Sequence, residues 1–209
     1  MGKWFPNIYD VAMKPLEKNR FKKIRKKLID NASGRVLEIG SGSGINFSYY
    51  KNVDQVDAIE PNPEMSKLAQ KRIHAADIPI QTHAVGAEGL PFNDDTFDCV
   101  VATLVFCTIP NPIKAINEIQ RVSKPGAKLL FFEHVRMNQK VLAKLQDGLT
   151  PVWKKLCDGC HLNRDTLGLL SKTGIVIEQV DYYYKGLFLT TKAKNNKEPI
   201  RLSNLKQDK

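Results

Sequence analysis

The sequence lacks the features that mark secreted and membrane-spanning proteins. Its longest apolar run, residues 99–109, has 11 residues, about half of what a membrane-spanning helix needs. The first residues contain no apolar stretch of the kind that directs secretion. Cysteine is scarce, with 4 in 209 residues, and we expect these side chains to be reduced thiols. The expected protein is therefore cytoplasmic and contacts a membrane at most peripherally.

Acidic residues are outnumbered by basic ones, 22 to 32, and the excess lies at the two ends of the chain. Residues 14–28 hold eight Lys or Arg and one acid, and residues 185–209 hold seven and two. Residues 29–184 sum to a net charge of −2. Basic ends suit an anionic membrane surface, nucleic acid or simple solubility, and composition leaves these alternatives open.

Apolar segments and helical patterns alternate along the chain from residue 35. Strands are predicted over five segments: 35–39, 55–59, 80–85, 97–103 and 128–135. Helices are predicted at 44–50, from Pro63, from Pro112, at 138–147 and at 163–172. Two final strands, near 174–181 and 183–194, are joined too tightly for a helical crossover, so they should pair antiparallel. The predicted fold class is α/β: a Rossmann-like, seven-stranded, mostly parallel sheet with a C-terminal antiparallel hairpin and helices on both faces.

The strongest functional signal is the segment Val36-Leu37-Glu38-Ile39-Gly40-Ser41-Gly42-Ser43-Gly44. Its glycines let the chain turn sharply after a strand and bring the backbone close to a ligand. Doubly wound sheets bind ligands at the carboxyl ends of their strands, where this loop is expected. A Gly-x-Gly-x-Gly run alone indicates no more than a nucleotide-like ligand.

Two carboxylates narrow the identity of that ligand. Glu38 stands two residues before Gly40, where it would repel a pyrophosphate but suits a cation such as the methionine portion of S-adenosylmethionine. Glu60 ends the next strand, 20 residues after Gly40, where an acid can accept hydrogen bonds from both ribose hydroxyls. Dinucleotides and S-adenosylmethionine both contain ribose, so only the pair of carboxylates discriminates between them.

Four segments resemble successive motifs of class I S-adenosylmethionine-dependent methyltransferases: 36–44, 87–92, 97–101 and 121–126. The resemblance is strongest to the branch that includes quinone-biosynthesis and phospholipid methyltransferases. Three further segments, 103–107, 133–135 and 159–164, are similar to a methyltransferase-like group that includes thiol methyltransferases. Together these resemblances span roughly residues 8–190, and they specify the cofactor better than the substrate.

The resemblance implies roles for individual residues. The set expected to hold S-adenosylmethionine, or its product S-adenosylhomocysteine, is Tyr9, Glu38, Gly40, Ser41, Gly42, Gly44, Glu60, Pro61, Met65, Ala87, Glu88, Thr103 and Leu104. Within it, Glu38 and the glycine loop would hold the methionine end, Glu60 the ribose, and Ala87 and Glu88 the adenine. Many relatives have Asp where Gly86 stands, so adenine recognition here would depend on Glu88 and the backbone. The implied organisation is N-terminal lid helices over 1–30, a methyltransferase domain over 31–195, and a basic flexible tail over 196–209.

A catalytic base is needed only if the methyl acceptor carries a proton at neutral pH, because the sulfonium is already activated. His134, just after the fifth predicted strand, is the candidate base, with a structural role as the alternative. His161 is the second candidate. The acceptor is expected to be a small molecule or lipid, and a thiol, an amine and a phenol or quinol all remain open.

The segment Cys157-Asp158-Gly159-Cys160-His161 matches a haem-attachment pattern. Haem attachment requires export, for which no signal is seen, and zinc would require further ligands at short spacing. None follow, so no metal site is expected.

Two other enzyme classes fit the sequence less well. A nucleic-acid methyltransferase would suit the basic charge, but neither an Asn-Pro-Pro-aromatic motif after the fourth strand nor a Pro-Cys nucleophile is present. We therefore expect no nucleic-acid partner. An NAD-dependent reductase is opposed by Glu38 and by the lack of a Tyr-x-x-x-Lys pair. A non-catalytic binding protein stays possible because a fold does not dictate function, and the oligomeric state stays open.

Overall fold

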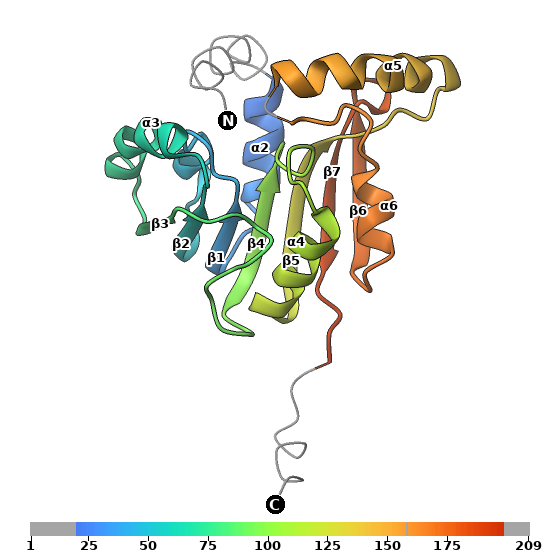
Figure 1. Cartoon of the computed structure of the whole chain (residues 1–209). Helices are drawn as coiled ribbons and strands as arrows, with labels where there is room; N and C mark the ends of the chain where they lie inside the picture. The colour runs from blue at the N-terminus through green and yellow to red at the C-terminus, as the bar shows by residue number, and fades with distance from the viewer. Residues whose placement is uncertain (1–19, 158, 199–209) are drawn as a thin grey trace, which may run out of the picture.

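The computed structural model describes residues 20–157 and 159–198 (Figure 1). The predictions for Tyr9, for most of the lid helices and for most of the basic tail lie outside these residues. Among the described residues, no helix combines the length and apolar character needed to cross a bilayer.

Seven strands form one sheet in the order β3-β2-β1-β4-β5-β7-β6. They are β1 (Gly34–Ile39), β2 (Val53–Ile59), β3 (Ile80–His83), β4 (Phe97–Thr103), β5 (Ser123–His134), β6 (Val176–Tyr183) and β7 (Phe188–Lys194). The first five strands pair in parallel, and β7 lies antiparallel between β5 and β6. The predicted fold class is confirmed, including the terminal hairpin, and the prediction for β4 was correct at both ends.

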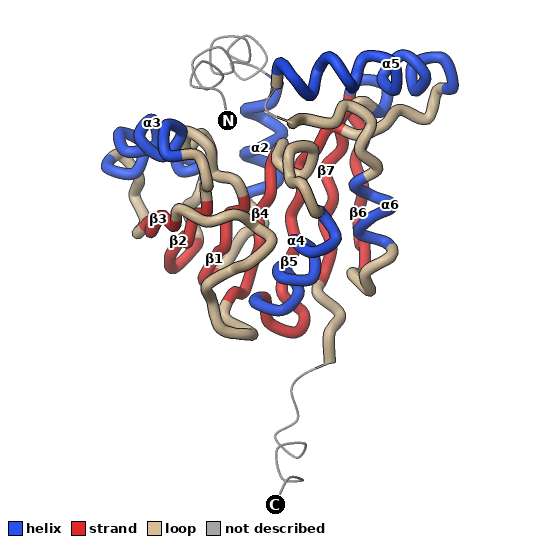
Figure 2. Tube along the Cα trace, in the orientation of Figure 1, coloured by secondary structure: helices blue, strands red, loops and turns tan. Residues whose placement is uncertain are grey.

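Helices cover both faces of the sheet (Figure 2). They are α2 (Lys22–Ile29), α3 (Pro63–His74), α4 (Pro112–Val122), α5 (Lys140–Leu156) and α6 (Thr166–Ser171). Side chains of α4 and α6 join one apolar cluster, and those of α2 and α3 join another. Residues of β4 alternate between the clusters, with Val100 and Ala102 in the first and Cys99 and Val101 in the second. This burial on both faces explains why the strand is a continuous apolar run.

Two asparagine caps start helices beside the carboxyl ends of the strands. Asn62 accepts a hydrogen bond from the Glu64 amide at 3.0 Å at the start of α3, and Asn111 accepts one from the Lys114 amide at 3.0 Å at the start of α4. Each cap is followed by proline, whose missing N–H costs nothing in the first helical turn. The prediction that α4 starts this way is confirmed.

One helix prediction was wrong, and another was too short. In place of a helix over 44–50, the chain forms turns and a short 3-10 helix, η2 (Phe47–Tyr49). The side chains of Asn46 and Tyr50 point inward and hydrogen-bond to the buried Glu38 carboxylate. The helix predicted over 138–147 is present, but α5 continues nine residues past that end, and buried Gln146 anchors its middle through the carbonyls of residues 135 and 162.

Candidate active site

A cavity opens at the carboxyl ends of β1 and β2 and beside the loops that follow β3 and β4. Five of the residues expected to bind cofactor line it: Gly40, Glu60, Pro61, Ala87 and Glu88. Its remaining lining is largely apolar and includes Ile39, Ile59, Val105 and Ile109, which sequence reasoning missed. These residues belong to no motif, and their position depends on how neighbouring strands align.

The two carboxylates of the cavity are held by backbone amides. Glu60 accepts hydrogen bonds from the amides of Gly42 at 3.0 Å and Asn62 at 2.8 Å. Glu88 accepts one from the amide of Asn111 at 3.1 Å. Each carboxylate is therefore fixed to the capping residue of a helix, Asn62 for α3 and Asn111 for α4. No Lys or Arg is among the lining residues that the structure describes. A ribose and a flat apolar base fit this lining, whereas a pyrophosphate would meet only negative charge.

The glycine loop approaches the cavity closely. Gly40 has φ +61°, a left-handed conformation, and a Cβ atom there would overlap the side chain of Val105 across the cavity. Gly42 has φ +55°, and a Cβ atom there would meet only the terminal methyl of Met65, at 3.6 Å. Met65 thus lies against the loop, not among the cavity-lining residues. Buried Ser41 ties the loop to β2 by donating its amide hydrogen to the Ile59 carbonyl at 3.0 Å.

Glu38 and Thr103 lie behind the loop in a buried polar network. Asn46 Nδ2 donates to Glu38 Oε1 at 2.9 Å and to Thr103 Oγ1 at 2.9 Å, and the Tyr50 hydroxyl donates to Glu38 Oε2 at 2.8 Å. Arg25, from α2, donates to Asn46 Oδ1 at 3.1 Å and to Thr103 Oγ1. Burial raises the pKa of Glu38 to about 7, although hydrogen bonds from Tyr50 and Asn46 and the charge of Arg25 act to lower it.

Sequence reasoning missed Arg25, Asn46 and Tyr50 as parts of the site. Arg25 lies among six other Lys and Arg residues within 18–27, and nothing in the pattern separates a buried guanidinium from its solvated neighbours. Its 4% exposure is the distinguishing feature, and only the packing of α2 on the sheet produces it.

Leu104 begins the loop after β4 in a conformation that is rare for a side-chain-bearing residue, with φ +55°. Its amide donates to the Phe132 carbonyl of β5 at 2.7 Å, which fixes this turn against the neighbouring strand. The buried carboxylate of Glu133 accepts hydrogen bonds from the amides of Val105 at 3.1 Å and Phe106 at 3.2 Å. The loop that borders the cavity is therefore held in place from β5.

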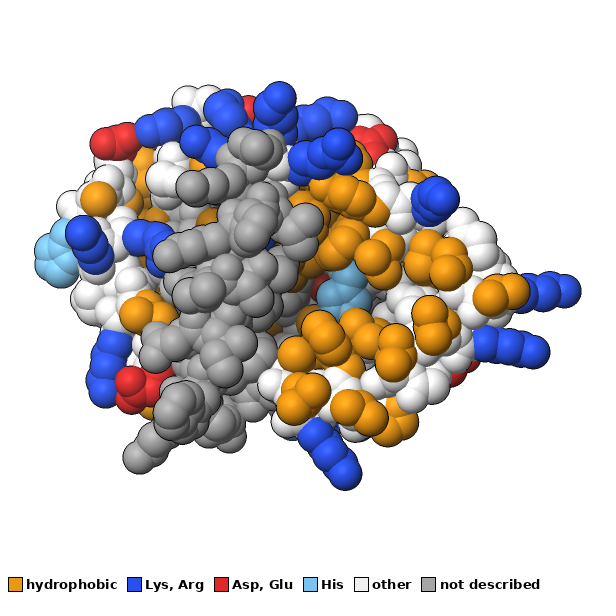
Figure 3. Space-filling view, turned by 90° about the horizontal axis from the view of Figure 1, so that it is seen from above, with side chains coloured by type: hydrophobic (Ala, Val, Ile, Leu, Met, Phe, Trp, Pro, Cys, Tyr) orange, Lys and Arg blue, Asp and Glu red, His pale blue; other side chains and the backbone are white. Residues whose placement is uncertain are grey.

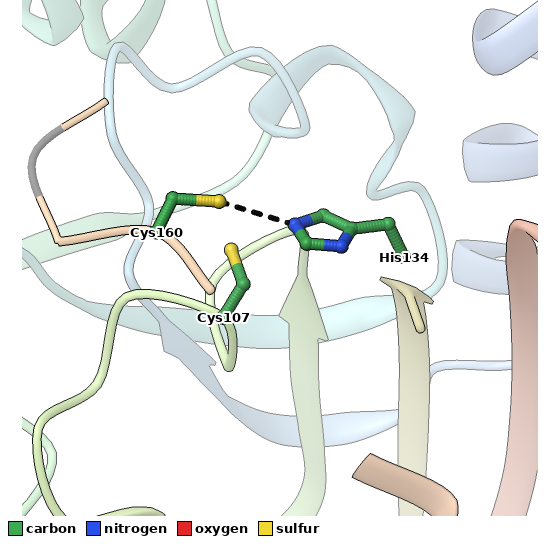
Figure 4. Close-up of side chains that lie close together, drawn as sticks. All are labelled: Cys107, His134 and Cys160. Atoms are coloured by element: carbon green, nitrogen blue, oxygen red, sulfur yellow. Dashed lines mark hydrogen bonds between the residues drawn. The ribbon is translucent and has the colours of Figure 1, made fainter. Parts of the chain in front are cut away.

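His134 ends β5 and lies in a cluster with Cys107 and Cys160 (Figure 4). Its Nε2 atom is 3.3 Å from Cys160 Sγ, and the ligating atoms of all three side chains lie within 4.8 Å of one another. The pKa of the Cys160 thiol is lowered, mainly by its hydrogen bond with Cys107 and also by its hydrogen bond with His134, although burial opposes both. Burial acts to lower the pKa of His134, but the hydrogen bond to Cys160 and the charges of Cys160 and Glu133 together outweigh it, and the pKa is raised. The imidazole is therefore paired with a thiol.

His161 and Arg164 hold the backbone around this cluster. The His161 amide donates to the Cys107 carbonyl at 2.9 Å, and Arg164 donates to the carbonyls of Cys107 at 3.2 Å and Ile109 at 3.1 Å. The His161 ring is itself 3.0 Å from Arg164 and 3.2 Å from the Cys107 carbonyl, and these contacts are those of a structural residue. The sequence alone indicates a small buried side chain at Cys107 and does not group it with the other two, because 26 residues separate it from His134 and 52 separate it from Cys160.

Known proteins resemble this chain in sequence. A family model described as a methyltransferase domain matches residues 37–131. Thiol S-methyltransferase TMT1B of Rattus norvegicus is 40% identical over 136 residues, covering 63% of this chain and 55% of the rat protein. The protein of the same name from Mus musculus is 35% identical over 185 residues, covering 79% of this chain and 75% of that protein. The chain thus spans between about half and three quarters of the length of these relatives.

The fold is shared with a solved structure of a putative methyltransferase from Bacillus halodurans. The TM-score is 0.69 at 17% identity, and the match covers 84% of this chain and 100% of the other. At that identity the likeness concerns the fold alone. The strand order, the glycine loop with its carboxylates and the 35% identity to a relative covered over three quarters of its length agree with one another. The chain belongs to the class I S-adenosylmethionine-dependent methyltransferases.

Proposed function

We propose that this protein transfers a methyl group from S-adenosylmethionine to the thiol of a small-molecule or lipid acceptor. The observation that carries the cofactor assignment is the cavity in which Glu60 and Glu88 are fixed beside the glycine loop. The choice of a thiol is supported by the rat and mouse relatives, both named as thiol S-methyltransferases.

The residues expected to bind the cofactor have different proposed roles. Glu60 accepts hydrogen bonds from the ribose hydroxyls, while Ala87 and Glu88 contact the adenine between apolar walls. The backbone of the glycine loop faces the methionine end, and Glu38 acts on it indirectly, by holding Asn46 and Tyr50 behind that loop. When bound, S-adenosylmethionine supplies an activated methyl group. The protein then has to align the acceptor and exclude water.

A thiol acceptor must lose its proton before its sulfur attacks, because the thiolate is the nucleophile. His134 is the residue that we propose brings the acceptor into this form, as part of its cluster with Cys107 and Cys160 and not as a free base, because its Nε2 atom is paired with Cys160 Sγ. It ends the strand next to β4, whose following loop supplies Val105 and Ile109 to the cavity wall. Thr103 and Leu104, at the same edge of the sheet, lie near the position proposed for the methyl group.

The proposed function is tested by ligand binding and by turnover. We expect S-adenosylhomocysteine at 100 times its dissociation constant to stabilise the protein by about 2.7 kcal/mol, and NADH to produce no shift in melting temperature. Incubation with labelled S-adenosylmethionine should then methylate alkyl thiols in preference to matched alkyl amines and phenols. Stabilisation by NADH alone would refute the assignment, as would methylation of the amine in place of the thiol.

We also propose that the protein contacts an anionic membrane surface through α5. Six apolar side chains of this helix form an exposed stripe, with exposed fractions from 41% to 79%: Val141, Leu145, Leu149, Val152, Trp153 and Leu156. Four exposed lysines belong to the same helix: Lys140, Lys144, Lys154 and Lys155. In Figure 3, the view onto this end of the molecule, apolar side chains gather around a hollow that contains a histidine ring.

An amphipathic helix with Trp and Leu on one face and Lys beside them is typical of segments that lie in a membrane interface. The four free cysteines support a reducing compartment, so the surface that we propose is an anionic cytoplasmic one.

Charged side chains introduced into the apolar stripe of α5 should weaken binding to the membrane surface. We expect the double variant Leu145→Glu, Val152→Glu to bind phosphatidylserine-containing vesicles at least about tenfold more weakly, because two apolar side chains no longer enter the interface. Val176→Glu is the matched control, since Val176 is also exposed, at 46%, but lies on the edge strand β6. Co-sedimentation with vesicles measures both. Equal vesicle binding by wild type and the double variant would contradict the proposal.

A further inference from the structure

Three metal-ligating side chains meet beside the cofactor cavity although no sequence motif joins them. Cys107 lies in the loop after β4, His134 ends β5, and Cys160 follows α5. We propose that these residues bind a zinc ion whose fourth position takes the thiol of the methyl acceptor. This inference rests on the proposed thiol methylation and adds a metal site to it.

The geometry of the cluster is close to that of a tetrahedral zinc site. Zinc lies about 2.3 Å from thiolate sulfur and about 2.0–2.1 Å from imidazole nitrogen, so two ligands of one ion stand about 3.5–3.8 Å apart. In the structure His134 Nε2 and Cys160 Sγ are 3.3 Å apart, and Cys107 Sγ completes a set within 4.8 Å. The three side chains point toward one another in Figure 4. An ion between them requires adjustments of about 1 Å at most.

The surroundings of the cluster hold the ligands in place. Cys107 and Cys160 are 3% and 8% exposed, and the Trp153 side chain hydrogen-bonds to the Cys160 sulfur. The His134 ring packs edge-on against Phe188, with 6.4 Å between ring centroids. Partners of this kind orient the ligands of metal sites and shield them from water.

A set of two cysteines and one histidine suits zinc and leaves one position open. Soft thiolates with an imidazole favour zinc over magnesium or calcium, which prefer oxygen ligands. Structural zinc sites are closed by four protein ligands, whereas catalytic sites keep the fourth position for water or substrate. Among the described residues, the group of possible metal ligands consists of these three side chains and has no fourth member. The open position is therefore available to an acceptor.

The cluster and the cofactor cavity share one loop. Val105 and Thr108, two residues before and one residue after Cys107, line the cavity, whereas Cys107 itself points into the cluster. A thiol held at the cluster is thus next to the site proposed for the methyl donor. Binding to zinc would deprotonate the acceptor thiol, and its proton would pass to solvent. The sulfur electron pair then forms the new carbon–sulfur bond while the sulfonium bond breaks, which releases a neutral thioether and S-adenosylhomocysteine.

Metal content tests the site without reference to activity. Protein purified under reductant with zinc and then dialysed is expected to hold one zinc per chain. Cys107→Ser and Cys160→Ser should each lose it, whereas Cys157→Ser should retain it, because Cys157 lies three residues from Cys160 but outside the cluster. Cobalt-loaded wild type should show a thiolate-to-metal charge-transfer band that Cys160→Ser lacks. Wild type without zinc, or with Cys107 and Cys160 linked as a disulfide, overturns the proposal.

Chelation separates the metal site from the methyltransferase assignment. At pH 7 a free thiol of pKa about 8.5 is about 3% thiolate, so metal-free protein should methylate an alkyl thiol more slowly, by up to about 30-fold. Added zinc should restore the rate, and stabilisation by S-adenosylhomocysteine should be the same with and without metal. An unchanged rate after zinc removal refutes the role of the metal. Bound zinc together with bound S-adenosylhomocysteine but no thiol methylation refutes the thiol acceptor and leaves the metal site standing.

Discussion

The Glu60→Ala variant is expected to bind S-adenosylhomocysteine on the order of 100-fold more weakly than wild type. Two hydrogen bonds from ribose hydroxyls to a carboxylate are each worth about 1.5–3 kcal/mol, and their loss leaves the hydroxyls unpaired in a cavity with apolar walls. Glu60 also accepts hydrogen bonds from the amides of Gly42 and Asn62, so the variant loosens the glycine loop as well. Isothermal titration measures the affinity directly.

Glu64→Ala is the matched control for this variant. Glu64 is four residues further on, in the first turn of α3, and its carboxylate is exposed and paired with Lys67. We expect its affinity for S-adenosylhomocysteine to equal that of wild type. If Glu60→Ala retained wild-type affinity while both variants kept their melting temperatures, the ribose assignment would be wrong.

The Glu38→Gln variant is expected to be more stable than wild type above pH 7 and equally stable near pH 4.5. Burial raises the pKa of Glu38 from 4.5 to about 7 in the folded protein. Between these values the folded state holds a proton that the unfolded chain has released, so wild-type stability falls as pH rises through this window. Glutamine mimics the protonated carboxyl at every pH. The difference at pH 8 is on the order of 3 kcal/mol, since one pKa unit corresponds to about 1.4 kcal/mol.

Denaturant unfolding of the ligand-free protein at pH 4.5, 6 and 8 measures this difference. Tyr50→Phe provides a second test of the same group, because the Tyr50 hydroxyl donates to Glu38 Oε2 and favours its charged form. Its loss should raise the pKa of Glu38 further, so that the decline of stability extends to higher pH and the total loss at pH 8 is larger. A decline of the same slope in Glu38→Gln and wild type would show that Glu38 does not titrate in this window.

The strands of the sheet could be predicted because each is a local pattern. The residues of β4 are buried on both faces, and a continuous apolar run is the direct consequence. The hairpin of β6 and β7 followed from the short connection between two apolar segments. The conformation around Asn46 is harder to predict, because its side chain bonds to the buried Glu38 carboxylate, and the segment forms turns where a helix was expected. The partner of Asn46, Glu38, lies on β1, and only the fold brings its carboxylate within reach.

Five of the residues expected to bind the cofactor line one cavity, because its polar residues lie where strands end. Gly40, Glu60 and Glu88 follow β1, β2 and β3, and parallel strands place their carboxyl ends at one edge of the sheet. The spacing of motifs along the chain therefore carries the spatial arrangement. The apolar wall was not accessible, since Ile39, Ile59 and Ile109 look like any other core residues.

The fold class and the family follow from the sequence alone, because they depend on local patterns and on spacing along one chain. The meeting of Cys107, His134 and Cys160 depends on the tertiary structure, as does the contact of Arg25, on a basic helix, with Thr103. The strand order places β4 beside β5, and the loop after α5 brings Cys160 against His134 at the end of β5. These contacts join segments 26 to 78 residues apart. They form because both faces of the sheet are buried at once, and a local sequence pattern does not predict that.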